Sequence, residues 1–291
     1  MRRTLSPKQV SRALDVSESS VKRWCDKGAI ATQYTAGGHR RIAMAAFVTF
    51  LRESKHTVVR PEVVGLPATT GQTCRIVDRA CLQMTDALIA GDELLCRRIA
   101  LDLYLAEHSL STICDGVLAR AFEAIGDRWE CGTAQVYQER RGCEISLRVL
   151  HELESLVPIP TADAPIAIGG TAAGDQYSLG TTMAQLVLRD LQWNAISLGD
   201  NLPFDTLGAA IVEHRPRIFW ISCSYIERED TFLRDYLQLY DSFGSDVAFV
   251  VGGRALTEPL RQKMKYAAYC DNMQHLESFA RTLRDASVRR V

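Results

Sequence analysis

The sequence predicts a multidomain chain of α and α/β architecture: a small helical head with a β-hairpin, a four-helix bundle and a doubly wound parallel-sheet domain. Three observations support this order. Basic residues are concentrated in the first 60 positions, apolar residues then recur at helical spacing, and short apolar runs later alternate with helical segments. The expected boundaries are a head at 1–57, a linker at 58–72, a bundle at 73–158 and an α/β domain at 162–291.

The formal net charge of −1 conceals two oppositely charged parts. Residues 1–60 hold 12 Lys and Arg against 4 Asp and Glu, a net of +8, whereas the remaining residues carry a net of −9. A basic head on an acidic body predicts an N-terminal module that binds a polyanion.

Composition also narrows the class of protein. Nine cysteines are scattered without a C-x-x-C pair, and no Cys and His cluster has the spacing of a zinc site. No apolar run reaches the roughly 18 residues of a membrane span, and no hydrophobic core follows the basic N-terminus as it would in a secretory signal. We therefore expect reduced thiols, no metal site, no membrane partner and a cytoplasmic protein.

The head contains two short helical patterns separated by a tight turn. Ser6 and Pro7 begin the first, Ser17 caps the second, and Gly28 ends it. This spacing is typical of a helix-turn-helix. Hydroxyl and cationic side chains on the second helix suit contacts with phosphates and base edges in the DNA major groove. These side chains are Ser19, Ser20, Lys22 and Arg23.

A glycine pair, Gly37 and Gly38, interrupts two β-capable runs and predicts a hairpin. We expect this hairpin to lie as a wing along the phosphate backbone, beside the second helix. A closing helix at 45–51 should pack beneath the two other helices. The expected wing contacts are Tyr34, His39, Arg40 and Arg41. The whole pattern resembles the winged helix-turn-helix of MerR-type and excisionase-like regulators, and the resemblance implies double-stranded promoter DNA as the partner.

The predicted linker has two prolines, two glycines and no helical period. Four helical patterns with short connections follow, which is typical of a small bundle. In the α/β domain, short apolar runs alternate strictly with helices, as in a Rossmann-type parallel sheet. The loop 174–180 follows the first strand and therefore faces the ligand crevice at the carboxyl ends of the strands.

That loop runs Asp175-Gln176-Tyr177-Ser178-Leu179-Gly180. It resembles the Asp-x-His-x-x-Gly signature of cobalamin-binding domains, in which the histidine ligates cobalt from below. Tyr177 stands where that family has its histidine. Two further motifs of that family follow at suitable distances. The Ser-x-Ser motif is Ser222 and Ser224, and the Gly-Gly motif is Gly252 and Gly253.

The order of the domains resembles the cobalamin-dependent, light-responsive repressors of the CarH type along nearly the whole chain. Those MerR-family proteins carry a tryptophan and, ten residues later, a Glu-His pair. The tryptophan and the glutamate line the upper face of the cofactor, and the histidine is used once light has cleaved the upper ligand. Trp129 and Glu139 hold the matching positions here, and Arg140 replaces the histidine. The other interpretation of Trp129 is an aromatic residue of the bundle core.

A phenol is a poor cobalt ligand, and a protonated guanidinium cannot ligate a metal. We therefore predict a DNA-binding transcriptional regulator that is not an enzyme and has no bound cofactor. Its sensor domain would serve homo-oligomerisation, a regulatory protein partner or a different ligand. We also expect Tyr177→His to raise cobalamin affinity, unless the pocket itself has closed.

Three alternatives remain open. Cobalamin could be held without a protein ligand in a light-responsive repressor, or another tetrapyrrole such as haem could occupy the crevice. The α/β domain could also be the corrinoid carrier of a methyltransferase system. No nucleophile triad, carboxylate pair or metal constellation otherwise points to catalysis.

Overall fold

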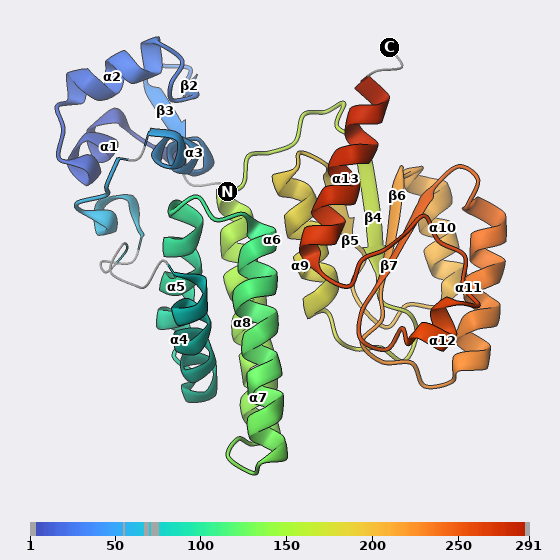
Figure 1. Ribbon diagram of the computed structural model, residues 1–291. Coiled ribbons are helices and arrows are strands. Elements are labelled where there is room, and N and C mark those ends of the chain that lie inside the picture. Colours follow the sequence, from blue (N-terminus) through green and yellow to red (C-terminus); the bar gives the residue numbers. More distant parts are fainter. Residues whose placement is uncertain (1–3, 55, 67–69, 71–75, 289–291) are drawn as a thin grey trace. The chain divides into compact units, whose positions relative to one another are not determined.

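The computed structural model describes residues 4–54, 56–66, 70 and 76–288 (Figure 1). The chain divides into two compact units, Met1–Pro158 and Ile159–Val291. The first holds the predicted head and bundle, and the second holds the α/β domain. The predicted multidomain α and α/β architecture is confirmed.

The head is a winged helix-turn-helix built on a three-stranded antiparallel sheet of order β1-β3-β2. Ser6 caps α1, since its Oγ accepts from the backbone N–H of Gln9 at 3.2 Å. Val21 of α2 and Phe47 of α3 are fully buried between the helices. The elements are β1 (Thr4–Leu5), α1 (Pro7–Leu14), α2 (Glu18–Asp26), β2 (Thr32–Tyr34), β3 (Arg40–Ala43) and α3 (Met44–Ser54).

Much of the predicted linker is packed against the head. Residues 58–60 run along the end of α1, where the N–H groups of Val59 and Arg60 donate to the Ala13 carbonyl at 2.8 and 3.0 Å. A short 3₁₀ helix, η1 (Pro61–Val64), follows, and Val64 is fully buried. The apolar residues of this stretch thus extend the head, although they have no helical period. Residues 67–69, 71 and 72 of the predicted linker lie outside the described residues.

The bundle has the four helical segments that the periodicity predicts. The third is continuous but contains a π-helical stretch, η2, where Gly116 lies against Val77: a Cβ on Gly116 would lie 2.7 Å from Val77 Cγ1. The segments are α4 (Val77–Ala90), α5 (Glu93–Leu105), α6 (Leu110–Ile113) with η2 (Cys114–Ala119) and α7 (Arg120–Glu130), and α8 (Val136–Leu156).

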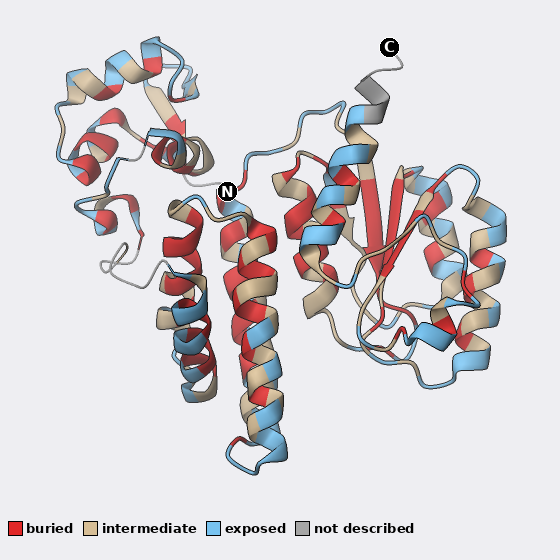
Figure 2. Ribbon diagram, in the orientation of Figure 1, coloured by how far each residue is buried: buried red, intermediate tan, exposed pale blue. Residues whose placement is uncertain are grey.

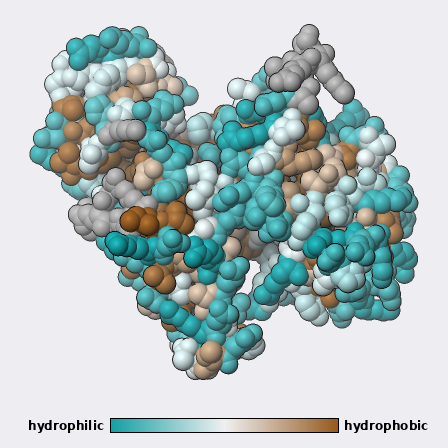
Figure 3. Space-filling model, in the orientation of Figure 1, coloured by the Kyte–Doolittle hydropathy of each residue, from teal (hydrophilic) through white to brown (hydrophobic). Residues whose placement is uncertain are grey.

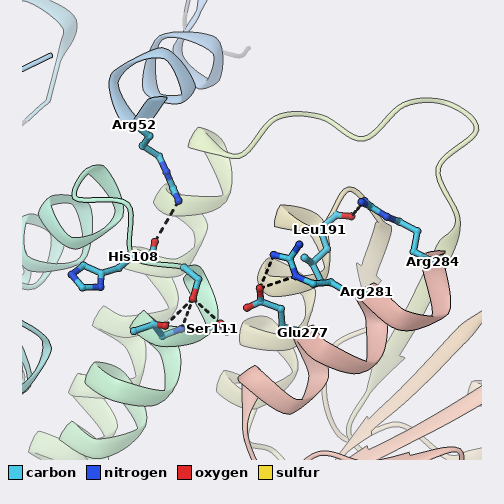
Figure 4. A network of polar contacts seen from close by, with 9 residues as sticks. Arg52, His108, Ser111, Leu191, Glu277, Arg281 and Arg284 are labelled. Carbon is cyan, nitrogen blue, oxygen red and sulfur yellow. Dashed lines mark hydrogen bonds and ion pairs between the residues drawn. The ribbon is translucent and has the colours of Figure 1, made fainter. Parts of the chain in front are cut away.

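The last helix of the head packs on the bundle, because α3 contacts α5 and α8. The guanidinium of Arg52 lies 3.9 Å from the centroid of the Tyr104 ring, a cation–π geometry. Arg52 also donates to the His108 carbonyl at 3.5 Å (Figure 4). The head and the bundle are therefore joined by side-chain contacts as well as by the chain itself.

The second unit has a five-stranded parallel sheet of order β5-β4-β6-β7-β8. Figure 1 shows α9 and α13 on one face and α10 and α11 on the other, and Figure 2 shows buried strands between helices with exposed outer sides. The elements are β4 (Ile166–Gly170), α9 (Leu179–Asp190), β5 (Asn194–Ser197), α10 (Phe204–His214), β6 (Ile218–Ser222), α11 (Glu229–Phe243), β7 (Ala248–Gly252), α12 (Glu258–Arg261), β8 (Ala268–Tyr269) and α13 (Met273–Val288).

Side chains of the strands alternate between the two faces, as the pleat requires. Phe219 and Phe249 pack together under α10 and α11, with ring centroids 5.0 Å apart and the ring planes tilted by 56°. Trp193 and Trp220 are buried on the opposite face, under α9 and α13. The end of α13 is tied back to the end of α9 by a hydrogen bond from Arg284 to the Leu191 carbonyl (Figure 4).

Candidate functional site

The N-terminus of α2 gathers hydroxyl groups. Ser17 caps the helix by accepting from the Ser20 N–H at 3.1 Å. Its Oγ also lies 2.8 Å from Ser19 Oγ and 2.9 Å from Ser20 Oγ. Three hydroxyls at the positive end of a helix dipole provide a surface that suits a phosphate group.

The two predicted cations of α2 differ in their surroundings. Lys22 forms an ion pair with Glu18 at 2.9 Å, one turn earlier on the same helix. Arg23 is exposed, and its guanidinium has no hydrogen bond or ion pair with the described part of the chain. Arg23 is therefore the cation of α2 that is most readily available to a phosphate.

The predicted wing is present as the hairpin of β2 and β3. Thr35 N–H donates to the His39 carbonyl at 3.0 Å, and Gly38 adopts a φ of +74° that closes the turn. Tyr34 is 60% exposed and His39 is exposed at the tip, whereas Arg41 is half-buried. The tip thus presents an aromatic ring and an imidazole to the solvent.

Arg40 points back from the wing onto the helix. Its Nη1 donates to the Lys22 carbonyl at 2.9 Å, and its Nη2 is paired with the Asp26 carboxylate. The hydrogen bond with Asp26 raises the pKa of the Arg40 guanidinium. Arg40 thus positions the wing against α2, and a phosphate contact by this residue remains a prediction.

If the ion pair between Arg40 and Asp26 holds the wing in its DNA-binding position, Asp26→Ala and Arg40→Ala should weaken DNA binding by a similar factor. The double substitution should weaken it no further, because all three variants lose the same contact. Fluorescence anisotropy with a labelled duplex at fixed salt measures each affinity. A gain of DNA affinity in Asp26→Ala would contradict this positioning role, since removing a carboxylate near DNA strengthens binding when charge alone matters.

In the second unit, Asp175 organises the carboxyl edge of the sheet. It is only 1% exposed, and its carboxylate accepts from the N–H groups of Tyr177 at 3.0 Å, Ser224 at 2.6 Å and Tyr225 at 3.2 Å. Its backbone carbonyl accepts from Asn201 N–H at 2.9 Å. The loops after β4, β5 and β6 are therefore joined through one residue.

The glycines predicted to line the crevice allow the chain to approach itself. A Cβ on Gly180 would lie 2.6 Å from Ser222 Oγ, so the first turn of α9 lies directly against β6. A Cβ on Gly252 would lie 2.4 Å from the Cys270 carbonyl oxygen. Gly253 has a φ of +109° and lies against the backbone of the β6 loop. These close contacts account for glycine at all three positions without a ligand.

Tyr177 is half-buried at this edge. The Arg254 guanidinium lies 5.7 Å from the centroid of its ring, and Arg254 Nε donates to the Ser224 carbonyl at 3.5 Å. The position of the family's cobalt ligand therefore holds a phenol beside a cation. The structure brings Asp175, Tyr177 and Ser224 together, and it places Gly180 against Ser222.

The three predicted residues of the bundle lie near the α7–α8 turn. Trp129 is 51% exposed, so the interpretation as a core aromatic is wrong. Glu139 is half-buried and Arg140 is exposed, both in the first turns of α8. Brown patches interrupt a largely hydrophilic surface in Figure 3. The exposed large apolar residues of the bundle are Ile76, Leu82, Leu94, Trp129, Val136 and Tyr137.

The thiols are mostly buried. Burial raises the pKa of Cys96 to about 12 and that of Cys270 to about 11, and it also raises the pKa of Cys114 and Cys223. These side chains therefore remain protonated, weakly nucleophilic thiols at neutral pH. Among the described cysteines, Cys131 at the α7–α8 turn is exposed.

In the part of the chain that the structure describes, no cluster of three or more His, Cys, Asp or Glu side chains could hold a metal ion. No helix in that part combines the length and the apolar character needed to cross a membrane.

Two family models match the first unit. A model described as a helix-turn-helix domain matches residues 4–55, and one described as a B12 binding domain matches residues 81–154. The chain therefore carries a helix-turn-helix domain and a B12-binding domain. This pair supports a DNA-binding regulator with a cobalamin-binding-like domain. No curated protein matches the chain.

Among solved structures, the monomethylamine corrinoid protein of Methanosarcina barkeri is similar, with a TM-score of 0.59 and 14% identity over 69% of this chain and 96% of that one. At this identity the likeness shows the fold alone. A cobalamin-binding protein from Desulfitobacterium hafniense DCB-2 matches at 15% identity over 68% and 96%, with a TM-score of 0.38. The MtaBC complex of M. barkeri, a methanol:cobalamin methyltransferase, matches at 14% over 79% and 91%, with a TM-score of 0.39. Both scores are too low to bear on the fold.

Sequence reasoning missed several residues that shape these sites. Asp26 holds the wing, and Arg254 covers Tyr177. Trp220 and Thr181 are hydrogen-bonded to each other below the carboxyl edge of the sheet. Each acts through a partner far away in the sequence, so that no local pattern marks it; in the strand at 218–222, Trp220 is simply one apolar residue among several.

Proposed function

We propose that this protein is a cytoplasmic, homo-oligomeric transcription regulator of the MerR type that binds promoter DNA through α2 and the wing. The observation that carries this proposal is Arg23, which is exposed and has no partner among the described residues, next to the hydroxyl cluster of α2, with Arg40 holding the wing alongside. The net charge of +8 over residues 1–60 supports the same role, because phosphate contacts dominate the affinity for DNA.

We further propose that the α/β unit works without cobalamin. The residues present do not fit that cofactor: the 174–180 loop has no imidazole, and Tyr177 offers a phenol beside the Arg254 guanidinium. Arg140 on α8 also lacks a lone pair for a metal. The unit instead serves assembly, a regulatory protein partner or another ligand.

This proposal makes the protein a regulator and not an enzyme. Asp175, the buried carboxylate at the carboxyl edge of the sheet, accepts hydrogen bonds from three backbone N–H groups and therefore has a structural role. A corrinoid carrier of a methyltransferase system needs the cobalt-binding chemistry that the loop lacks. A light-responsive repressor needs it as well.

Selection from a pool of random-sequence duplexes with the purified full-length protein tests the DNA-binding role. We expect enrichment of one sequence, and an affinity for it whose logarithm falls linearly with the logarithm of the salt concentration. Failure to enrich any duplex, with no salt-dependent binding to unselected DNA, would overturn the proposal.

A further inference from the structure

One row of residues crosses the sheet just below the crevice, on the face that α9 and α13 cover. Gly169 of β4 is paired with Ser197 of β5 and with Trp220 of β6, and Trp220 is paired with Val250 of β7. Gly169 is the next-to-last residue of its strand. Because Gly169 has no side chain, this row would leave a slot between β4 and α9 at the point where the strand order reverses.

The indole of Trp220 fills that slot. A Cβ on Gly169 would lie 2.3 Å from Trp220 Cδ2 and 2.4 Å from Cγ, so the ring lies directly against the glycine. Trp220 is 3% exposed, and its Nε1 donates to Thr181 Oγ1 at 2.9 Å. Thr181, in the first turn of α9, is itself fully buried and lies 3.2 Å from Ser197 Oγ.

The entrance to the slot is closed as well. Gly180 precedes Thr181 on α9, and its Cα hydrogens face Ser222 on β6, the next residue of that face toward the crevice. A group entering from the crevice would have to part α9 from β6 and then displace the indole. The two glycines that could make room for a ligand make room for Ser222 and Trp220 instead.

We infer that Trp220 is an internal occupant of a slot that would otherwise admit a planar, fused-ring nitrogen heterocycle, and that it closes the α/β unit to cobalamin together with Tyr177. Indole and benzimidazole, the base at the end of the cobalamin tail, are both flat six-five bicycles. The Thr181 hydroxyl, which accepts from the indole N–H, can equally donate to an aromatic nitrogen. This inference deepens the proposed cobalamin independence and rests on it.

The test compares the full-length protein with three variants after incubation with adenosylcobalamin in the dark and desalting. The variants are Tyr177→His, Tyr177→His with Trp220→Gly, and Tyr177→His with Trp193→Gly. Trp193 is the matched control, because it is a fully buried tryptophan of the same cluster but precedes β5, at the opposite end of the strands. We expect the wild type, Tyr177→His and the Trp193 variant to be colourless, and the Trp220 variant to retain a corrin absorption band.

Three results would overturn the inference that Trp220 fills the slot: a corrin band in Tyr177→His alone, an equal band in the Trp193 variant, or a folded but colourless Trp220 variant. The third would leave the proposed cobalamin independence standing. A corrin band on the wild type would overturn both.

A second measurement covers the case in which the double variant does not fold. Trp220→Ala and Trp193→Ala are heated with and without 5,6-dimethylbenzimidazole. The base should raise the Tm of Trp220→Ala by filling the vacated slot, and should not raise that of Trp193→Ala or of the wild type. An unchanged Tm in Trp220→Ala would overturn the inference.

Discussion

Asp175→Ala is expected to destabilise the α/β unit by about 3 kcal/mol or more, since a hydrogen bond to a charged acceptor contributes roughly 1.5–3 kcal/mol and the variant leaves three part-buried donors without this acceptor. Three backbone N–H groups, those of Tyr177, Ser224 and Tyr225, lose their acceptor at once. Hydrogen exchange followed by mass spectrometry measures this effect unit by unit. Peptides from β4 and β6 should exchange faster, while peptides from 77–156 should not change.

Asp200→Ala is the control for this substitution. Asp200 lies half-buried on the loop after β5, at the same edge of the sheet, and its carboxylate makes no hydrogen bond or ion pair with the described residues. Its removal should change stability by no more than about 0.5 kcal/mol, as is usual for a surface substitution away from special features. Equal acceleration of exchange in both variants would contradict the organising role of Asp175.

Arg23→Ala is expected to weaken DNA binding about tenfold and to lower the slope of log affinity against log salt by about 1, because one phosphate contact is lost. Arg23 is exposed and unpaired within the described residues, so its truncation removes no contact of the folded head. Anisotropy titrations of a labelled duplex at several salt concentrations give both quantities.

Arg79→Ala separates a local contact from the loss of net charge. Arg79 is an exposed arginine in the first turn of α4, in the bundle, so the change in charge is the same while the site differs. Its affinity and salt slope should match those of the wild type. If Arg79→Ala and Arg23→Ala shift both quantities equally, α2 is not the docking face.

The parts of the fold that could be predicted are those that depend on local sequence patterns, such as capping residues and the spacing of apolar residues. Ser6 and Ser17 cap helices where the sequence places them, and the helical spacing yields the four bundle segments. Alternation of apolar runs and helices was enough to predict the parallel sheet, because the three central strands, β4, β6 and β7, are largely buried on both faces. The strand order itself confirms the topology of a doubly wound sheet.

The remainder depends on contacts between distant residues. The predicted linker packs on the head because Val64 becomes buried. The apolar residues of this stretch have no helical period, so the sequence does not predict this packing. Arg40 turns toward Asp26, 14 positions earlier, although the sequence alone favours the phosphate backbone. The opposition of Trp220 and Gly169 follows from strand register, which the sequence pattern does not reveal.

The same contacts change the expectation for Tyr177. From the sequence, a histidine at this position should raise cobalamin affinity. With the Trp220 indole against Gly169 and Ser222 against Gly180, the imidazole alone should gain nothing. In the proposed account, the missing ligand and the filled slot are separate obstacles to cobalamin, and each is removed by a different substitution.

The most direct test of this account measures the affinity of the purified protein for its selected duplex in three states: without cobalamin, with adenosylcobalamin in the dark, and with adenosylcobalamin after illumination. A DNA-binding regulator whose α/β unit is closed to cobalamin should show the same Kd in all three states and remain colourless after desalting. A Kd that changes with cobalamin or with light, accompanied by a bound corrin spectrum, would contradict it.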